Sequence, residues 1–235
     1  MSNMQISYRL ERVASNVHYG KVVADIGCDH GFTSIYLIEN KLAEHIIAMD
    51  INKGPLERAA AHVKEYHMED DIELRLSDGA KELKPCEADT LLISGMGGIL
   101  ITKILNDSRE VVQNAKELVL SPQSDVELVR KCIHEMGFSI ENEEMLIDQG
   151  KFYIVIRAVA GKEKYDCEED YIYGKKLAEN KDKVFGQFLI KERERVTKVL
   201  NKLNSMSLSE KAYMKKKEIE REYDMILRMI NRINE

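Results

Sequence analysis

Acidic and glycine-rich segments follow four strand-like runs in the first half of the chain. Asp25 opens DIGCDHG, Asp50 ends HIIAMD, Asp78 lies in SDG after IELRL, and Gly95 opens GMGG after TLLIS. In an open α/β sheet, ligands bind beyond the carboxyl ends of the parallel strands. The four segments are therefore predicted to meet at one edge of a sheet and to form a binding site there.

The segment at residues 25–31 has the features of a ligand-binding glycine loop. Gly27 and Gly31 permit a tight turn and bring the backbone close to a ligand at the start of the next helix. Asp29 lies between them, and a carboxylate beside two phosphates is electrostatically unfavourable. S-adenosylmethionine has a positive sulfonium and no phosphate, so an acidic loop suits that cofactor. A diphosphate cofactor is the competing interpretation.

The acids after the next two strands predict contacts with a nucleoside. Asp50 follows Asp25 by 25 positions, a spacing at which a carboxylate accepts hydrogen bonds from both hydroxyls of a cofactor ribose. Asp78, with Gly79 after it, is placed to accept from an exocyclic adenine amino group, or alternatively to cap a helix. The three glycines of residues 95–98 lack side chains and so expose backbone to a ligand. Packing alone does not account for them, because each weakens regular structure by up to about 1 kcal/mol relative to alanine.

Strands that alternate with helices must position these segments. Strand-like runs at 21–27, 45–51, 72–78, 88–95 and 117–123 alternate with helical patterns, after an opening amphipathic helix over residues 6–17. Such alternation predicts a parallel sheet. Two further runs, at 139–147 and 151–159, predict an antiparallel hairpin. This order resembles that of class I methyltransferases over residues 20–160, and it implies an α/β fold with a Rossmann-like sheet.

The last part of the chain predicts a separate antiparallel helical hairpin of the coiled-coil type. Apolar residues there follow helical spacings, and Ser207 with Glu210 predicts that the second helix begins near residue 208. Residues 161–235 carry 18 Lys and Arg against 15 Asp and Glu, a net charge of +3, whereas residues 1–160 carry 17 against 26, a net charge of −9. A basic appendage is compatible with a polyanionic partner, although a solvated helical surface explains +3 about equally well. We expect a cofactor-binding catalytic domain at 1–160 and an RNA-binding or interaction domain at 161–235.

The composition excludes several classes of protein. With 44% hydrophobic and 32% charged residues, the chain is too apolar for intrinsic disorder. No apolar run approaches the roughly 20 residues that span a bilayer, so a cytoplasmic protein is expected. The four cysteines form no C-x-x-C pair and the six histidines no H-E-x-x-H motif, which predicts neither a metal site nor a disulfide framework.

Together the motifs resemble the bacterial tRNA (adenine22-N1)-methyltransferases, the TrmK family. The resemblance rests on R-L-x-x-V-A (Arg9 to Ala14), A-D-I-G-C-D-H (Ala24 to His30), Asp78-Gly79, G-M-G-G (Gly95 to Gly98) and Pro122. It extends over essentially the whole chain, since a helical hairpin at the C-terminus is also a family trait. Ser121 and Gln123 depart from the Gln and Asn expected around Pro122.

The resemblance implies methyl transfer from S-adenosylmethionine to N1 of adenine 22 in tRNA. Neutral N1 already carries a lone pair, so the enzyme must chiefly align it and stabilise the transferred charge, for which Asp29 is the candidate catalytic residue. The alternative for Asp29, that its carboxylate only orients the cofactor or supports the loop, stays open. Basic residues predicted to contact RNA are Arg9, Lys215, Lys216 and Lys217. Residues predicted to contact the cofactor are Asp25, Gly27, Cys28, Asp29, His30, Gly31, Asp50, Ile51, Asp78, Gly79, Gly95, Met96 and Gly97.

Two other functions stay open at this point. A methyltransferase acting on a small molecule or a protein would share the same strand ends, and a non-catalytic RNA-binding protein could keep a relic cofactor pocket. The sequence predicts neither which tRNA species are modified nor whether the protein is a monomer or a coiled-coil dimer.

Overall fold

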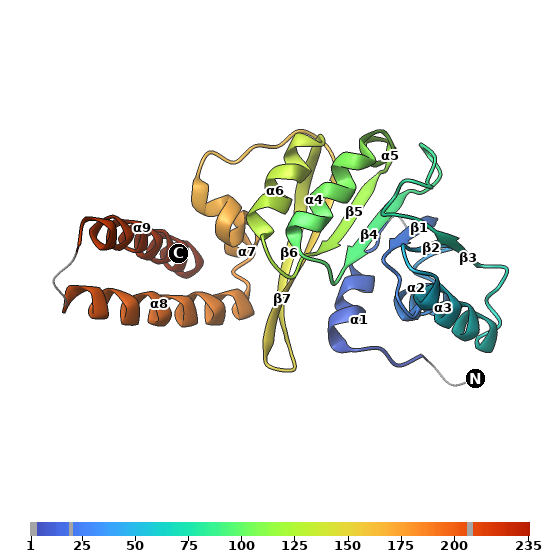
Figure 1. Cartoon of the computed structure of the whole chain (residues 1–235), viewed down its shortest axis with the longest axis horizontal. Coiled ribbons are helices and arrows are strands. Elements are labelled where there is room, and N and C mark those ends of the chain that lie inside the picture. The colour runs from blue at the N-terminus through green and yellow to red at the C-terminus, as the bar shows by residue number, and fades with distance from the viewer. Residues whose placement is uncertain (1–3, 19–20, 206–208) are drawn as a thin grey trace. The chain divides into compact units, whose positions relative to one another are not determined.

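The protein consists of two compact units, Met1–Lys164 and Tyr165–Glu235. The structure is a computed structural model that describes residues 4–18, 21–205 and 209–235 (Figure 1). The division falls at residue 164, where the change of pattern in the sequence suggested 160.

A seven-stranded sheet forms the centre of the first unit. Its order is β3-β2-β1-β4-β5-β7-β6, with β1 to β5 parallel and β7 antiparallel to both β5 and β6. The strands are β1 (Val22–Ile26), β2 (His45–Asp50), β3 (Ile72–Leu76), β4 (Thr90–Ser94), β5 (Glu117–Ser121), β6 (Phe138–Asp148) and β7 (Lys151–Ala160). The predicted parallel sheet with a terminal antiparallel hairpin is confirmed.

Helices cover both faces of this sheet. They are α1 (Tyr8–Ser15), α2 (Phe32–Glu39), α3 (Lys53–Glu65), α4 (Gly98–Asp107), α5 (Arg109–Asn114) and α6 (Val126–Glu135). Successive strand side chains point to opposite faces. Val23 and Leu92 therefore join the core that contains residues of α1, α2 and α3, while their buried neighbours Ala24 and Leu91 face the other side. Figure 1 shows α4 and α6 side by side, and the two helices contact each other.

The connection from β3 to β4 differs from the regular alternation of strands and helices. Residues 77–89 form turns without a helix, and Gly79 and Cys86 have left-handed backbone conformations, with φ of +66° and +64°, that a helix does not admit. The alternative role of Asp78 as a helix cap is therefore wrong, since no helix begins there. A helix that the sequence pattern did not indicate, α5, follows α4 directly after Ser108.

The second unit contains a π-helical turn, η1 (Asp170–Gly174), followed by α7 (Lys175–Glu179), α8 (Lys183–Asn204) and α9 (Glu210–Asn234). The helices α8 and α9 form the predicted hairpin. Ser207, the predicted cap, lies outside the described residues. The cap that the structure shows is Ser209, whose side chain accepts a hydrogen bond from Ala212 N at 3.4 Å.

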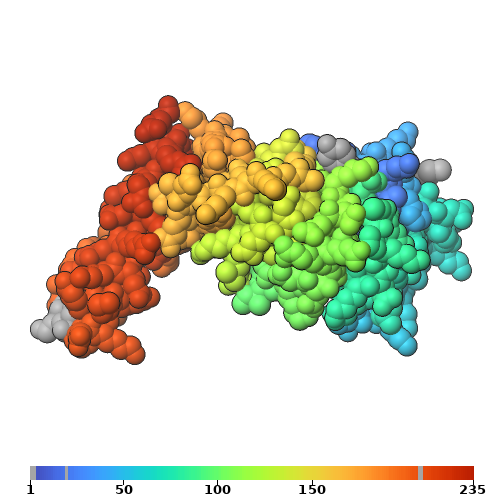
Figure 2. Space-filling view, turned by 90° about the horizontal axis from the view of Figure 1, so that it is seen from above, coloured from blue at the N-terminus to red at the C-terminus, as the bar shows by residue number. Residues whose placement is uncertain are grey.

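The hairpin packs through apolar residues and is braced by ion pairs. Its buried residues are Phe185, Leu189 and Val196 of α8 and Ile219, Met225, Ile226 and Met229 of α9. Three acids before α7, at positions 168–170, pair with Arg221, Arg228 and Arg232 of α9. In Figure 2 this light-orange segment lies against the red helix α9.

Within the described residues, no helix is long and apolar enough to cross a membrane. The same residues contain no group of three or more His, Cys, Asp or Glu side chains that could hold a metal ion.

Candidate active site

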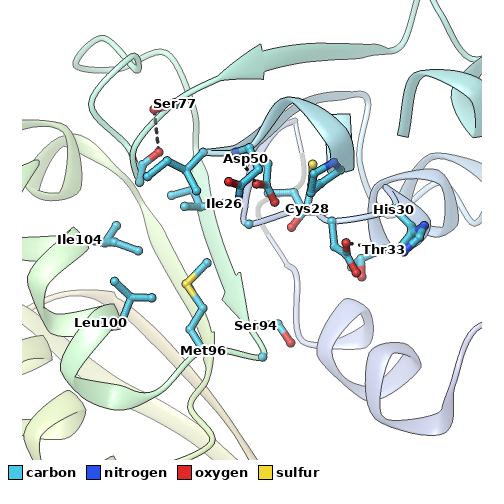
Figure 3. A pocket seen from close by; sticks show the side chains of 18 of the residues that line it. Ile26, Cys28, His30, Thr33, Asp50, Ser77, Ser94, Met96, Leu100 and Ile104 are labelled. Atoms are coloured by element: carbon cyan, nitrogen blue, oxygen red, sulfur yellow. Dashed lines mark hydrogen bonds and ion pairs between the residues drawn. The ribbon is translucent and has the colours of Figure 1, made fainter. Parts of the chain in front are cut away.

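A cavity of about 550 Å³ opens at the carboxyl ends of the parallel strands, within the size range of small-molecule sites. It lies where the strand order reverses, between β1 and β4. The segments after β1, β2, β3 and β4 all line it, so the structure brings together the four strand ends that the sequence singled out. In Figure 3, Cys28 and Asp50 lie on one side of the cavity and Met96, Leu100 and Ile104 on the other.

The loop after β1 is tied to the neighbouring strand and kept open by a glycine. The N–H groups of Gly27 and Cys28 both donate to the carbonyl oxygen of Met49, at 2.8 and 2.9 Å. Gly27 has φ of +79°, and a Cβ at this position would lie 2.1 Å from Met96 Cε. A side chain at Gly27 would therefore fill the space between the loops that follow β1 and β4.

Asp25 is a buried carboxyl group at the floor of this site. Ser34 Oγ donates to its Oδ2 at 2.6 Å. Burial, followed by the charge of Asp50, raises the pKa of Asp25 to about 6, against the lowering effect of the Ser34 hydrogen bond. The same two carboxylates, together with burial as the larger cause, raise the pKa of the Cys28 thiol, so Cys28 is a neutral lining group and not a nucleophile.

Asp50 presents one free carboxylate oxygen to the cavity. Its Oδ1 accepts from Asn52 N at 2.8 Å, which fixes the side chain at the end of β2. Oδ2 makes no hydrogen bond with the described residues, so it is available to a ligand hydroxyl. Ile51, the next residue, is exposed on the cavity wall and offers an apolar surface.

Asp29 and His30 form the outer rim of the loop after β1. Asp29 has left-handed backbone geometry, with φ of +49°, and its side chain is 66% exposed. Its Oδ1 lies 3.6 Å from both His30 Nε2 and Arg58 Nη2. The His30 ring stacks on Phe32 with 5.4 Å between ring centroids. Asp29 thus lines the cavity with an exposed carboxylate that lies near the His30 ring and the Arg58 guanidinium.

The turn after β3 places Asp78 at the opposite end of the site. Ser77 Oγ donates to Gly79 O at 2.8 Å and accepts from Glu82 N at 3.2 Å, which holds the turn in shape. Asp78 is exposed and pairs with Lys81, and this hydrogen bond lowers the pKa of Asp78. The carboxyl group is therefore an ionised acceptor at the cavity edge.

The loop after β4 meets helix α1. Arg9 Nη1 donates to Ser94 Oγ at 2.9 Å, and the guanidinium carbon lies 5.4 Å from the centre of the Tyr153 ring, a cation–π arrangement. Arg9, which the sequence proposed as an RNA contact, therefore lines the same cavity as the predicted cofactor residues.

Most of the residues singled out in the sequence line the cavity, and a few do not. Gly31 and Gly97 do not line it; they cap the starts of α2 and α4. Lys215, Lys216 and Lys217 lie on α9 in the other unit. Lining residues that were not predicted to contact a ligand are Leu10, Ile26, Phe32, Thr33, Asn52, Pro55, Ser77, Ser94, Leu100, Ile104 and Gln123. Two of these residues could have been predicted from the sequence. Leu100 and Ile104 are four positions apart on the predicted helix after G-M-G-G and so share one face.

The charge of the site is predominantly negative. Four carboxylates, from Asp25, Asp29, Asp50 and Asp78, line the cavity, and Arg9 is the only Lys or Arg among the residues that line it within the described part of the chain. An acidic cavity favours a cationic ligand over one with a diphosphate.

Comparisons with known proteins agree with this geometry. A family model described as "Methyltransferase domain" matches residues 6–156. The tRNA (adenine(22)-N(1))-methyltransferase of Bacillus subtilis is 29% identical over 98% of this chain and 99% of its own length. A putative tRNA (m1A22) methyltransferase of Streptococcus pneumoniae, solved with S-adenosyl-L-methionine, is 28% identical with a TM-score of 0.85 over 96% of this chain and all of that one. TrmK of M. capricolum, solved with S-adenosyl-homocysteine, is 25% identical with a TM-score of 0.82 over 97% and 99% of the two chains.

Proposed function

Because the chain belongs to the family that shares this methyltransferase domain, we propose that it transfers a methyl group from S-adenosylmethionine to N1 of adenine 22 in tRNA. The observation that carries the proposal is the acidic cavity at the reversal of strand order, whose four carboxylates suit a cationic cofactor without phosphates. The full-length likeness to relatives named for this reaction supports the choice of substrate. We place the reaction in the cytoplasm, where bacterial tRNA is found.

The residues present fit the cofactor. Asp50 Oδ2 is available to the ribose hydroxyls, Asp78 to the adenine amino group, and Ile51 to the adenine face, while Gly27 leaves the space that a side chain would occupy. S-adenosylmethionine supplies an electrophilic methyl group on a positive sulfonium. Asp25, which is buried and lines the cavity, would gain a favourable interaction from a cation bound in it.

The chain's own contribution to the reaction is alignment and charge stabilisation. Adenine N1 needs no general base because its lone pair is free. As the positive charge passes to the base, a fixed carboxylate at the cavity rim stabilises it. Asp29 has the position and exposure for that role, and the His30 and Arg58 side chains lie 3.6 Å from its Oδ1.

The tip of the helical hairpin is the proposed RNA contact. Residues 198–217 contain six lysines and one glutamate, whereas the remainder of Tyr165–Glu235 contains 10 Lys and Arg against 13 Asp and Glu. Tyr213 and Met214 are 49% and 58% exposed within the tip, and Lys217 Nζ lies 4.9 Å from the centre of the Tyr213 ring. Cations beside an exposed aromatic ring suit a nucleic-acid backbone and its bases.

The lysines of the tip differ in whether they form ion pairs. Lys215 and Lys216 pair with Glu218 and Glu220 of the next turn, whereas Lys211 and Lys217 make no ion pair with the described residues. We therefore infer that Lys211 and Lys217 contact phosphates more directly than the two paired lysines do.

The matched test compares two pairs of lysines on the hairpin. Lys211→Gln with Lys217→Gln should weaken tRNA binding. It should also make the negative slope of log affinity against log salt shallower by about 2, one for each lost phosphate contact. The control, Lys181→Gln with Lys183→Gln, removes the same charge about 20 to 30 Å away, at the other end of α8, and should leave the slope unchanged. Equal slopes for the two double variants would contradict the tip assignment.

Transfer of labelled methyl groups tests the proposed function as a whole. Unmodified tRNA should accept label from S-adenosylmethionine, and tRNA with guanine in place of adenine 22 should not. Labelling of both tRNAs would contradict the target nucleotide. Cofactor binding by calorimetry without transfer to any tRNA would favour the relic-pocket alternative.

A further inference from the structure

The loops after β4 and β5 form a second wall of the cavity. Gly95 N donates to Ser121 O at 3.2 Å, and Gln123 N donates to Met96 O at 2.9 Å. These two backbone hydrogen bonds join the loops side by side. Both Gly95 and Gln123 line the cavity, together with Arg9.

Gly95 leaves a gap that two polar side chains flank. Its φ is +82°, and a Cβ at this position would lie 3.9 Å from both Arg9 Nη1 and Gln123 Nε2. Because Gly95 has no side chain, a flat ligand can approach its backbone between the guanidinium and the amide.

The two flanking side chains differ in the contacts that they already make within the protein. Arg9 donates to Ser94 Oγ and lies over the Tyr153 ring. Gln123 is exposed, and its amide makes no hydrogen bond with the described residues. The Gln123 amide can therefore hydrogen-bond to a ligand without breaking a hydrogen bond to the described residues.

The reaction dictates which edge of the target base can be read. N1 must face the methyl group, so the protein cannot hydrogen-bond to N1 without blocking the lone pair that attacks. Apart from N1, adenine carries the lone acceptor N3 on one edge and, on another, N7, an acceptor, beside the outer hydrogen of the N6 amino group, a donor. A glutamine amide matches that pair, because its oxygen accepts from N6 and its NH₂ group donates to N7.

We propose that Gln123 reads the N6–N7 edge of the target adenine and is a specificity-determining residue for the methyl transfer. This proposal rests on the proposed function. Guanine presents acceptors at both O6 and N7, so the Gln123 amide cannot satisfy both atoms and disfavours guanine at the target position.

The test removes each partner of the predicted hydrogen bond to N7. The value of kcat/KM is measured for tRNA with adenosine or 7-deazaadenosine at position 22, with the wild-type protein and with Gln123→Ala. The 7-deaza base keeps N1 and N6 and lacks the N7 acceptor. We expect the wild type to lose about five- to tenfold on the 7-deaza substrate, the scale of one hydrogen bond, and the variant to lose less than twofold.

Comparing two proteins on two tRNAs, as in a double-mutant cycle, separates a contact with the base from an effect of the 7-deaza base on tRNA folding. Altered folding of the 7-deaza tRNA would lower the rates of both proteins equally, so only the difference between them reports the contact. Ser124→Ala, a change in the adjacent loop residue, which does not line the cavity, should keep the wild-type discrimination. Gln123→Glu retains an acceptor for N6 but has no donor for N7, so it should also lose the discrimination.

Each result supports or overturns the proposal. Loss of discrimination in both Gln123 variants, with retention in Ser124→Ala, supports it. Equal rates of the wild type on the two tRNAs, or full discrimination in both Gln123 variants, overturns it while leaving the proposed function intact. No transfer by the wild type to adenosine 22 would overturn both.

Discussion

Replacement of Asp25 by asparagine tests the electrostatics of the site. Burial raises the pKa of Asp25 from 3.8 to about 6, a shift of about two units that corresponds to about 3 kcal/mol. Because the pKa in the folded state lies above the value in the unfolded state, the folded protein holds the proton more tightly between about pH 4 and 6. The contribution of this group to the free energy of unfolding is therefore present below pH 4 and is lost as the pH rises through 6.

The asparagine keeps an oxygen that accepts from Ser34 Oγ and cannot ionise. Asp25→Asn should match the wild type at pH 4 and be more stable by up to about 3 kcal/mol at pH 7.5 without cofactor. Urea unfolding at several pH values measures this difference. Asp70→Asn, an exposed control, should show no such change with pH. A difference between Asp25→Asn and the wild type that stays constant with pH would refute the reasoning.

The same carboxyl group links cofactor affinity to pH. A cation bound in the cavity would favour the ionised form of Asp25, so wild-type affinity for S-adenosylmethionine should fall about tenfold from pH 7 to pH 5 as Asp25 takes up a proton. Asp25→Asn should bind more weakly than the wild type at pH 7 and lose most of this pH dependence. Calorimetry at the two pH values measures both effects, and an unchanged pH dependence in the variant would remove Asp25 from the linkage.

The remaining predictions concern three cavity residues. Asp50→Ala should weaken cofactor binding by about 1.5 to 3 kcal/mol, the scale of hydrogen bonds to a charged acceptor, and unchanged affinity in calorimetry would remove it from the ribose site. Asp29→Asn keeps the shape and removes the charge, so kcat should fall more than cofactor affinity if the carboxylate stabilises the transferred charge; an unchanged kcat would end that proposal. Gly27→Ala should lose about 1 to 2 kcal/mol of stability through its left-handed backbone and should also bind cofactor less tightly, and wild-type values for both quantities would contradict the role of Gly27.

The strand ends could be predicted because local pattern and chemistry coincide there. Each apolar strand runs directly into an acid or a glycine, and the topology of a parallel sheet brings those ends together. The acid after β3 was ambiguous, because the role of Asp78 depends on whether a helix follows, and the Pro-containing connection 77–89 forms turns instead.

Contacts between distant parts of the chain lay beyond sequence reasoning. Tyr153, from the β6–β7 hairpin, meets Arg9 only because α1 packs on β5, β6 and β7. In the helical unit, α9 contacts α7 as well as α8, so its buried face includes Met225 and Met229 and is wider than a two-helix seam. Val199, one of the apolar residues whose helical spacing predicted the hairpin, is instead 37% exposed near the end of α8.

The most direct test of the central claim is to identify the nucleotide, and the atom within it, that receives the methyl group. Unmodified tRNA is incubated with S-adenosylmethionine and either the wild-type protein or Asp50→Ala, and nuclease fragments are analysed by mass spectrometry. We predict 1-methyladenosine at position 22 with the wild type and much less of it with the variant at limiting cofactor. Methylation at another position or at N6, or no methylated nucleoside at all, would contradict the account.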